Sequence, residues 1–455
     1  MLTYELNKRQ GVPLYEALYR CIREDILKGV LKPGQKLPSK RALAAHLEVS
    51  KITVEGAYDQ LVAEGYLSSR EKVGYFVAEV ETHTTAPLHR QPPQPPADHR
   101  IDLTSNAPVR FPFSVWSKLQ RQVIRDVGEQ LLLPLPNLGL WQLRQAIADH
   151  LAQFRGMQVQ PEQILIGAGT DFLYNLLIQL LGRDGLYACE DPGYGKIRKI
   201  YAAGGVRCIS APMDELGVIP DSLGSAQVLH ISPSHHFPPG IITPVTRRQE
   251  LRQWAGTEKW IIEDDYDSEF RFNAHPVPAM QALDKHGRVI YMNTFSKTLA
   301  PSIRISYMIL PPALMERFQR ELGFYSCTVP SFEQHTLAQF LAEGYFEKHL
   351  NRMRKFYRSR RDRLLAAIAA SPLADRLTIL EENAGLHFLL QVDSPLTDRQ
   401  LTNRCAAAGI KIHALSDYCH ERQQDTGMLV VNYSGLTDEQ LTKLEQLLRS
   451  FPTTL

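Results

Sequence analysis

Apolar positions in the first 80 residues follow a helical period and then give way to two strand-like runs. Apolar side chains recur every four residues between positions 14 and 26, which predicts an amphipathic helix that ends near Gly29. Ser39 and Ser50 are suited to cap two further helices, one over 40–46 and one beginning at Lys51. The run YLSSREKVGYFVAEV then predicts a hairpin with a charged turn.

Beyond about residue 106, helical stretches alternate with short apolar strands, a pattern that predicts an α/β fold with a largely parallel sheet. The predicted strands are QILIG (163–167), AQVLHIS (226–232), KWIIEDDY (259–266) and RVIYMNTFS (288–296). An arginine-rich helical stretch follows from about 333 to 370, and the last 70 residues predict a smaller α+β part.

A proline-rich segment separates these two patterns. Residues 86–99 contain five prolines, which fix φ and remove amide donors, so we expect a semi-extended linker there. We therefore predict a first domain over 1–80, a linker over 81–105 and a second domain over 106–455.

Composition excludes several classes of protein. Of the 455 residues, 44% are hydrophobic and 22% are charged, as in ordinary globular proteins. No apolar run approaches the roughly 20 residues of a membrane-spanning helix, and the start lacks the apolar core of a signal peptide, so we expect a cytoplasmic protein without a membrane partner. The six cysteines form no C-x-x-C pair, and we predict no metal site.

Basic residues gather around the second and third predicted helices, although the whole chain carries a net charge of only +2. Two helices joined by a short turn, the second beginning with polar and basic residues, are typical of a helix-turn-helix that reads DNA. The alternative is the solvated face of an ordinary three-helix unit. The candidate DNA contacts are Lys36, Lys40, Arg41, Ser50, Lys51, Thr53 and, at the hairpin tip, Lys72.

The literal string from Leu31 to Val77 resembles the winged helix-turn-helix of the GntR family. It carries LPSKRALA, VSKITV, LVAEG and GYFV in the order of that family's motifs. The resemblance implies binding to double-stranded promoter or operator DNA. Lys51 stands where arginine is usual, and lysine keeps the charge but loses the planar fork.

The string TFSKTLAPSIR, 294–304, points to a second chemistry. A lysine at a strand end can form a Schiff base with an aldehyde cofactor, and flanking hydroxyls with a later arginine can hold that cofactor's phosphate. This assigns Lys297 to the aldehyde. The phosphate contacts are Thr294, Ser296 and Arg304.

Three further strings suit the same cofactor, and each has an ordinary alternative. In EDDYDSEF, Asp264 and Tyr266 share one face of a strand, although the string also fits an acidic strand end with solvated carboxylates. Gly169 and Thr170 open a helix whose N-terminus can bind phosphate, but such junctions are common. Tyr194, in EDPGYG, can stack on a flat ring or simply lie on the surface.

Together these strings resemble, over 106–455, the fold-type-I aminotransferases, which use pyridoxal 5′-phosphate (PLP). The resemblance implies Lys297 as the Schiff-base lysine, Asp264 as the partner of the pyridine nitrogen, Tyr266 as the donor to the 3-oxygen and Tyr194 as the stacking ring. Gly169, Thr170, Thr294, Ser296 and Arg304 would surround the phosphate. Combined with the GntR reader and PSHHFPPG, the chain resembles the MocR/GabR subfamily of transcription regulators.

Four features of the second domain depart from the patterns of these families. In PSHHFPPG, His236 and Phe237 stand where an asparagine usually touches the 3-oxygen. Asp171 brings a carboxylate close to the predicted phosphate site, which is unfavourable unless it turns away. Ser306 replaces a usual glycine. The late strand GMLVVNYSGL carries Val430 near the place of the arginine that clamps a substrate carboxylate.

Two functions fit these residues. We expect a regulator in which the aminotransferase-like domain acts as a sensor, with no catalytic residues assigned; the alternative is a working aminotransferase with an appended DNA-binding module. The missing arginine favours PLP itself as the signal, with control of vitamin B6 supply as the output. The rival signal is a small amino acid clamped by Lys196 or Arg198.

A homodimer is implied by the resemblance. The basic cluster over 351–363 is either a second contact for DNA or a partner, or a solvated helix face.

Overall fold

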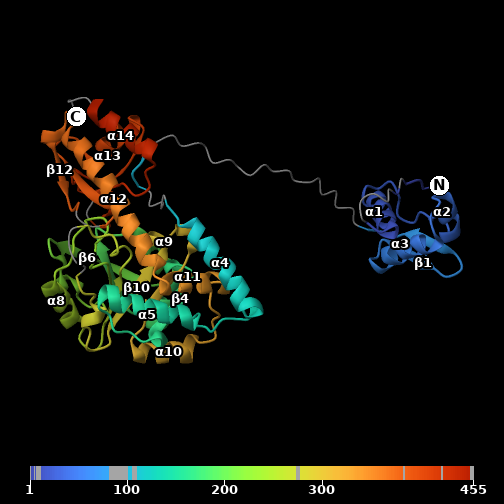
Figure 1. Cartoon of the computed structure of the whole chain (residues 1–455), viewed down its shortest axis with the longest axis horizontal. Helices are drawn as coiled ribbons and strands as arrows, with labels where there is room; N and C mark the ends of the chain where they lie inside the picture. Colours follow the sequence, from blue (N-terminus) through green and yellow to red (C-terminus); the bar gives the residue numbers. More distant parts are fainter. Residues whose placement is uncertain are drawn as a thin grey trace. The chain divides into compact units, whose positions relative to one another are not determined.

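The chain divides into two compact units, Met1–Ala97 and Asp98–Leu455 (Figure 1). The computed structural model describes residues 2–4, 6, 12–80, 101–104, 110–272, 277–382, 385–421 and 424–450. Most of the linker predicted at 81–105 lies outside these residues. Its last part differs from the prediction, because strand β3 (Ile101–Asp102) pairs in parallel with β14 (Ile410–Lys411) and so belongs to the second unit.

The first unit has the predicted three helices and hairpin. They are α1 (Leu14–Leu27), α2 (Lys40–His46), α3 (Lys51–Ala63), β1 (Leu67–Arg70) and β2 (Gly74–Val77). The hydroxyls of Ser39 and Ser50 accept hydrogen bonds from the amides of Ala42 and Thr53, which fixes where α2 and α3 begin. The apolar stripes of all three helices meet in one core, so the polar start of α3 is left at the surface.

An eight-stranded sheet forms the centre of the second unit, and the expected α/β class is confirmed. In spatial order the strands are β4 (Ile164–Gly167), β11 (Ser306–Ile309), β10 (Val289–Thr294), β9 (Trp260–Asp264), β8 (Val228–Ile231), β5 (Leu186–Asp191), β6 (Arg207–Asp214) and β7 (Gly217–Val218). The strands from β10 to β6 run parallel, whereas β11 is antiparallel to both of its neighbours. Parallel strands end at one edge, which brings their following loops together.

Helices cover both faces of this sheet. Alternate residues of β10 point to opposite faces, so Tyr291 packs with α4 (Phe113–Val127), α5 (Trp141–Arg155) and α11 (Ser331–Ala342), while Met292 packs with α6 (Thr170–Leu181) and α10 (Pro312–Leu322). The remaining helices surround these elements. Among them are α7 (Gly195–Ala203), α8 (Val245–Ala255) and α9 (Phe295–Thr298).

The C-terminal part is the predicted smaller α+β region. Its sheet has the order β12 (Leu377–Leu380), β13 (His387–Val392), β16 (Met428–Asn432) and β15 (His413–Ala414), and it packs against helices. The helices of this part of the chain are α11 (Ser331–Ala342), α12 (Tyr345–Ala369), α13 (Asp398–Ala407) and α14 (Asp438–Ser450). The stretch predicted as helical from about 333 to 370 forms two helices, α11 and α12, which are separated at Gly344, whose φ of 70° is left-handed.

Arginines of the 351–363 cluster tie α12 to neighbouring segments. Arg354, Arg358 and Arg361 donate to the backbone carbonyls of Glu269, Phe272 and Glu382. Arg360 donates to the Asp438 carboxylate at 2.7 Å. These arginines therefore join α12 to neighbouring segments of the chain. Neither sequence interpretation, a contact for DNA or a partner or a solvated helix face, predicted this role. In the described part of the chain, no helix is long and apolar enough to cross a membrane.

Candidate cofactor site and DNA-binding surface

A cavity of about 340 Å³ opens where β5, β8, β9 and β10 end and α6 begins. It brings together eight of the nine predicted cofactor residues, and the ninth, Gly169, caps the start of α6. The residues that line the cavity include Thr170, Asp171, Tyr174, Glu190, Tyr194, Lys196, Phe237, Asp264, Tyr266, Asp267, Thr294, Ser296, Lys297, Arg304, Leu386 and His387.

Lys297 supplies a buried amine to this cavity. It lies in α9, the short helix that directly follows β10, so the strand end fixes its position. Burial lowers the pKa of Lys297 to about 8, against the opposing pull of the carboxylates of Asp267 and Asp264. A tenth or so of this amine is therefore neutral at pH 7, which makes it a better nucleophile than a surface lysine.

Asp264 ends β9 with one carboxylate oxygen satisfied and the other unused. Its Oδ2 accepts a hydrogen bond from the Tyr174 hydroxyl and lies 3.5 Å from Nε2 of His230. Its Oδ1 is buried without a hydrogen-bond partner among the described residues. A buried carboxylate oxygen left in this state is ready for a ligand N–H. Tyr174 was not predicted, although its place one helical turn after Thr170 puts it on the same side of α6.

The N-terminus of α6 and the turn after β10 form an anion cradle. Gly169 has a φ of 89°, and a Cβ at this position would overlap the guanidinium of Arg304, so the arginine lies flat against the glycine. Ser296 contributes a buried hydroxyl without a hydrogen-bond partner in the described structure. Thr294 differs, because its Oγ1 already accepts from the Ser296 amide at 3.1 Å and from the Ser306 hydroxyl at 2.8 Å. Ser306, where the families carry glycine, thus engages Thr294.

Asp171 does not turn away from this cradle. Its Oδ2 lies 2.7 Å from Nζ of Lys196 and 3.4 Å from a guanidinium nitrogen of Arg304. All three side chains line the cavity and are partly exposed. The carboxylate therefore shares the cations that a phosphate would use.

Aromatic side chains form the opposite wall. Tyr194 is half exposed and meets Phe237 edge to face at 6.1 Å, so a flat ring could lie against it. The Tyr266 hydroxyl lies 3.2 Å from Nδ1 of His235, which also pairs with Asp267 at 2.9 Å. Burial and the Asp267 charge raise the pKa of Tyr266 well above its ordinary value, so this phenol stays a hydrogen-bond donor.

The neighbouring residue of the histidine pair has another role. His236 points to Glu190, with its Nδ1 2.6 Å from the carboxylate, and its Nε2 lies 2.7 Å from the Thr243 hydroxyl. It thus packs behind the wall, and Phe237 is the residue of this turn that faces the cavity.

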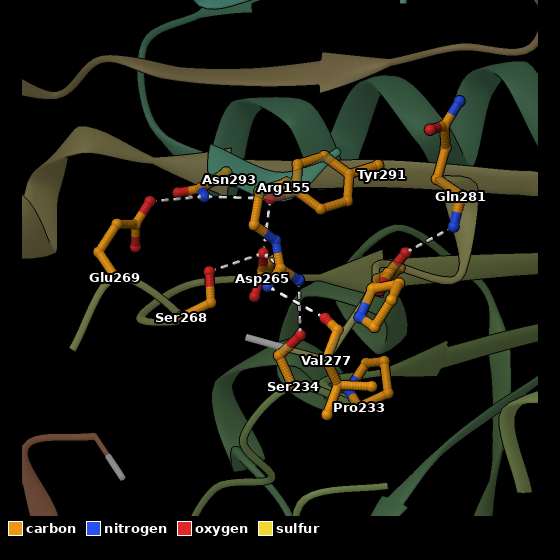
Figure 2. Close-up of polar contacts among 12 residues, drawn as sticks. Arg155, Pro233, Ser234, Asp265, Ser268, Glu269, Val277, Gln281, Tyr291 and Asn293 are labelled. Carbon is orange, nitrogen blue, oxygen red and sulfur yellow. Dashed lines mark hydrogen bonds and ion pairs between the residues drawn. The ribbon is translucent and has the colours of Figure 1, made fainter. Parts of the chain in front are cut away.

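A buried polar network holds the EDDYDSEF segment in place (Figure 2). Asp265 pairs with Arg155 at 3.0 Å and accepts from the Tyr291 hydroxyl at 2.5 Å. The Glu263 carboxylate accepts hydrogen bonds from the backbone amides of Met280 and Gln281 and lies 3.5 Å from the guanidinium of Arg248. The alternative of a solvated acidic strand end is wrong, because the three aspartates of the segment are at most 5% exposed.

The expected place of a carboxylate clamp is apolar. Val430, in β16, packs with Leu389 and Leu415. Arg198, offered as a substitute clamp, is committed elsewhere: one guanidinium nitrogen donates to the carbonyls of Cys189 and Ile209 and to the Ser210 hydroxyl. The interpretation that Arg198 clamps an effector is therefore corrected, and Lys196 remains.

The first unit presents an exposed, basic surface around the start of α3. Lys36, Arg41, Lys51 and Lys72 are exposed, and Ser50 and Thr53 share a hydrogen bond at the first turn of α3. Ile52 was missed by the sequence analysis, yet its side chain is 79% exposed between Lys51 and Thr53. The available signal was an apolar residue between Lys51 and Thr53 that lies off the buried stripe of Val54, Ala57, Tyr58 and Leu61.

Lys40 differs from the other predicted DNA contacts. Its ammonium lies 3.0 Å from Glu55, 3.1 Å from Asp59 and 5.2 Å from the centre of the Tyr75 ring. Lys40 therefore joins α2 to α3 and to the hairpin. Because its charge is balanced by carboxylates of its own unit, we do not propose it as a DNA contact.

Comparison with known proteins extends over both units. The family described as "Bacterial regulatory proteins, gntR family" matches residues 14–77. The probable rhizopine catabolism regulatory protein MocR of Rhizobium meliloti is 34% identical, over 98% of this chain and 95% of that protein. The pyridoxine biosynthesis transcriptional regulator PdxR of Corynebacterium glutamicum is 33% identical, over 94% of each chain.

The second unit has the fold of an aminotransferase. The crystal structure of Pyrococcus horikoshii kynurenine aminotransferase matches with a TM-score of 0.68 at 22% identity, over 78% of this chain and 90% of that one. The winged helix-turn-helix and the aminotransferase-like unit therefore occur in one chain, as they do in full-length relatives that regulate transcription. The chain belongs to the MocR/GabR subfamily of GntR-family transcription regulators.

Proposed function

We propose that this regulator binds PLP on Lys297 and that PLP itself is the signal that changes its affinity for promoter DNA. The observation that carries the proposal is the donor set of one cavity. A buried, partly neutral amine, an unused carboxylate oxygen on Asp264 and an anion cradle at Arg304 lie together there.

Each of these groups fits one part of PLP. The Lys297 amine suits the aldehyde, Oδ1 of Asp264 suits the protonated pyridine nitrogen, and the hydroxyl of Ser296 suits the phosphate. When bound, PLP supplies an electrophilic carbonyl and an electron-withdrawing ring. Asp264 would keep that ring protonated, Tyr194 and Phe237 would cover it, and Tyr266 would donate a hydrogen bond.

The same geometry disfavours an amino acid as the signal. A carboxylate in a partly dry site needs a forked cation, and the residues at the expected place are Val430 and its apolar neighbours. Lys196 is the remaining candidate, and it already pairs with Asp171. The relative named for regulating pyridoxine biosynthesis supports control of vitamin B6 supply as the output.

For the DNA side, we propose contacts from Lys36, Arg41, Ser50, Lys51, Thr53 and Lys72. Arg41 and Lys51 are exposed at the starts of α2 and α3, where the helix-turn-helix meets bases and phosphates. We add Ile52 as an apolar contact to a thymine methyl group, because such a contact is the direct use of an exposed apolar residue in the major groove.

We also propose that the second unit forms a homodimer. Large apolar side chains are exposed on α4 and on the adjoining 3-10 helix (Gly128–Leu132) and its following residue. They are Phe113 (75% exposed), Ile124 (54%), Leu132 (75%) and Leu133 (63%). Large apolar side chains exposed on adjoining elements favour a subunit interface, and a dimer suits two half-sites in DNA.

A titration of the protein–DNA complex tests the signal. The full chain is bound to a labelled fragment from upstream of its own gene, PLP is added alone, and a panel of amino acids is added afterwards, with fluorescence anisotropy as the readout. We expect PLP alone to change the affinity and the Lys297→Ala variant to be unresponsive. Pyridoxamine 5′-phosphate, which lacks the aldehyde, is the matched control ligand. If PLP has no effect and one amino acid changes the affinity, the amino acid is the signal.

A further inference from the structure

The carboxylate of Asp171 lies where the positive charges of the site would attract an anionic ligand. It lies in the first turn of α6, where the free backbone amides and the helix dipole favour negative charge. Its Oδ2 is 2.7 Å from Nζ of Lys196 and 3.4 Å from Arg304. An anion is therefore already built into the cradle that the phosphate of PLP would enter.

The two anions cannot use the cradle independently. The missing side chain at Gly169 lets Arg304 lie against the start of α6, because a Cβ there would overlap its guanidinium, so Arg304 faces the same space as Asp171. A phosphate on Arg304 either displaces Asp171 or accepts a like charge close by, and both alternatives weaken its binding. Lys196 moderates this effect, because it holds the same carboxylate oxygen at the shorter distance.

We propose that Asp171 is a built-in competitor of the ligand's phosphate, which sets the PLP concentration to which the regulator responds. This inference rests on the proposed function and deepens it. Without ligand, Asp171 balances Arg304 and the start of α6. With ligand, Asp171 is retained by Lys196 while Arg304 passes to the phosphate. Asp171 acts on affinity and takes no part in bond formation at Lys297.

The test is the equilibrium affinity of the full-length Asp171→Asn protein for PLP, measured by absorbance titration. Removing one like charge beside the phosphate site, at an effective dielectric constant between that of a protein surface and that of water, changes binding by about tenfold, so we expect the variant to bind PLP about tenfold more tightly. Affinity for pyridoxal, which lacks the phosphate, should not change. Inorganic phosphate should compete better in the variant. Asp184→Asn removes an exposed carboxylate beyond the other end of α6 and is the matched control.

Two further variants separate competition from a change in the fold. Asp171→Glu keeps the charge and should keep the weaker affinity. Lys196→Gln leaves the carboxylate to Arg304 alone and should weaken PLP binding, but it should have little effect in the Asp171→Asn background. Thermal unfolding of each variant shows that it is folded.

The outcomes distinguish this proposal from the one on which it rests. If wild type and Asp171→Asn bind PLP equally, or if the variant binds more weakly, the competitor role is overturned while PLP binding stands. An equal gain in affinity for pyridoxal would also overturn it, because the effect would not involve the phosphate. If neither protein takes up PLP, the proposed function fails and this inference fails with it.

Discussion

The lowered pKa of Lys297 leads to a quantitative prediction for how fast the chain captures PLP. Burial brings the pKa to about 8, so about 9% of the amine is neutral at pH 7. A lysine with the ordinary value of 10.5 would be about 0.03% neutral at that pH, roughly 300-fold less. If the neutral amine is the reacting form, the capture rate should rise about tenfold from pH 6 to 7 and level off above about pH 8.5.

Replacing the carboxylate of Asp267 tests this interpretation, because the direction in which the pKa of Lys297 should then move is fixed. Its charge opposes the effect of burial and keeps the pKa of Lys297 from falling further. Asp267→Asn removes that charge and keeps an acceptor for His235, so the midpoint of the rate profile should move to lower pH. Asp184→Asn, at an exposed position, should leave it unchanged.

Capture is measured by quenching with borohydride at timed intervals and quantifying the labelled Lys297 peptide by mass spectrometry. This readout does not depend on how pH changes the absorbance of the bound cofactor. A midpoint near 10.5, or a shift of the Asp267→Asn profile to higher pH, would refute the assignment of burial as the dominant cause.

Three further predictions concern DNA and stability. Arg41→Ala and Lys51→Ala should each weaken promoter binding by about 1–3 kcal/mol, measured by anisotropy at fixed salt, whereas the exposed Lys28→Ala should have little effect; an affinity independent of salt would contradict this. Ile52→Ser should reduce the preference for thymine over uracil at one position of the operator, and an unchanged preference at every position would remove Ile52 from the interface. Burial raises the folded-state pKa of Glu269 to about 7, so the folded protein loses stability as the pH rises from about 4.5 to 7 and this carboxyl group ionises. Glu269→Gln should therefore raise the unfolding temperature at pH 8 more than at pH 5. Equal shifts at the two pH values would contradict burial as the cause.

Local signals in the sequence were enough to predict the first unit and the strands that carry the cofactor residues. Ser39 and Ser50 mark the starts of α2 and α3 through hydrogen bonds within three residues, so no distant contact is needed to infer them. Lys297 and Arg304 likewise follow a strand that begins with the apolar run VIYM and is buried along its whole length. These features depend on neighbours along the chain, which a single sequence contains.

The partners of those residues depend on the order of strands in space, which the local pattern does not contain. Asp264 meets Tyr174 because the start of α6 and the end of β9 lie at one edge of the sheet, 90 residues apart in sequence. Charge alone predicted Lys40 as a DNA contact, but Glu55 and Asp59 on the next helix balance it.

The distribution of charge in the cavity argues for a ligand with a single strong anion. Among the described residues that line it, the basic side chains are Lys196, Lys297, Arg304 and His387. Burial lowers the pKa of His387 well below its ordinary value, so it contributes no charge at neutral pH. Lys297 is needed as a neutral amine, and Lys196 already holds Asp171 at 2.7 Å. Arg304, at the end of the cavity where α6 begins, is the one charged planar cation of this set, and its contact with Asp171 is the longer one at 3.4 Å, so it is the cation most readily passed to a ligand. A ligand that combines an aldehyde with one phosphate uses Lys297 and Arg304 once each, and its ring nitrogen would meet Asp264, whereas an added amino acid would bring a second anion for which these residues offer no further forked cation. This match supports PLP as both the cofactor and the signal.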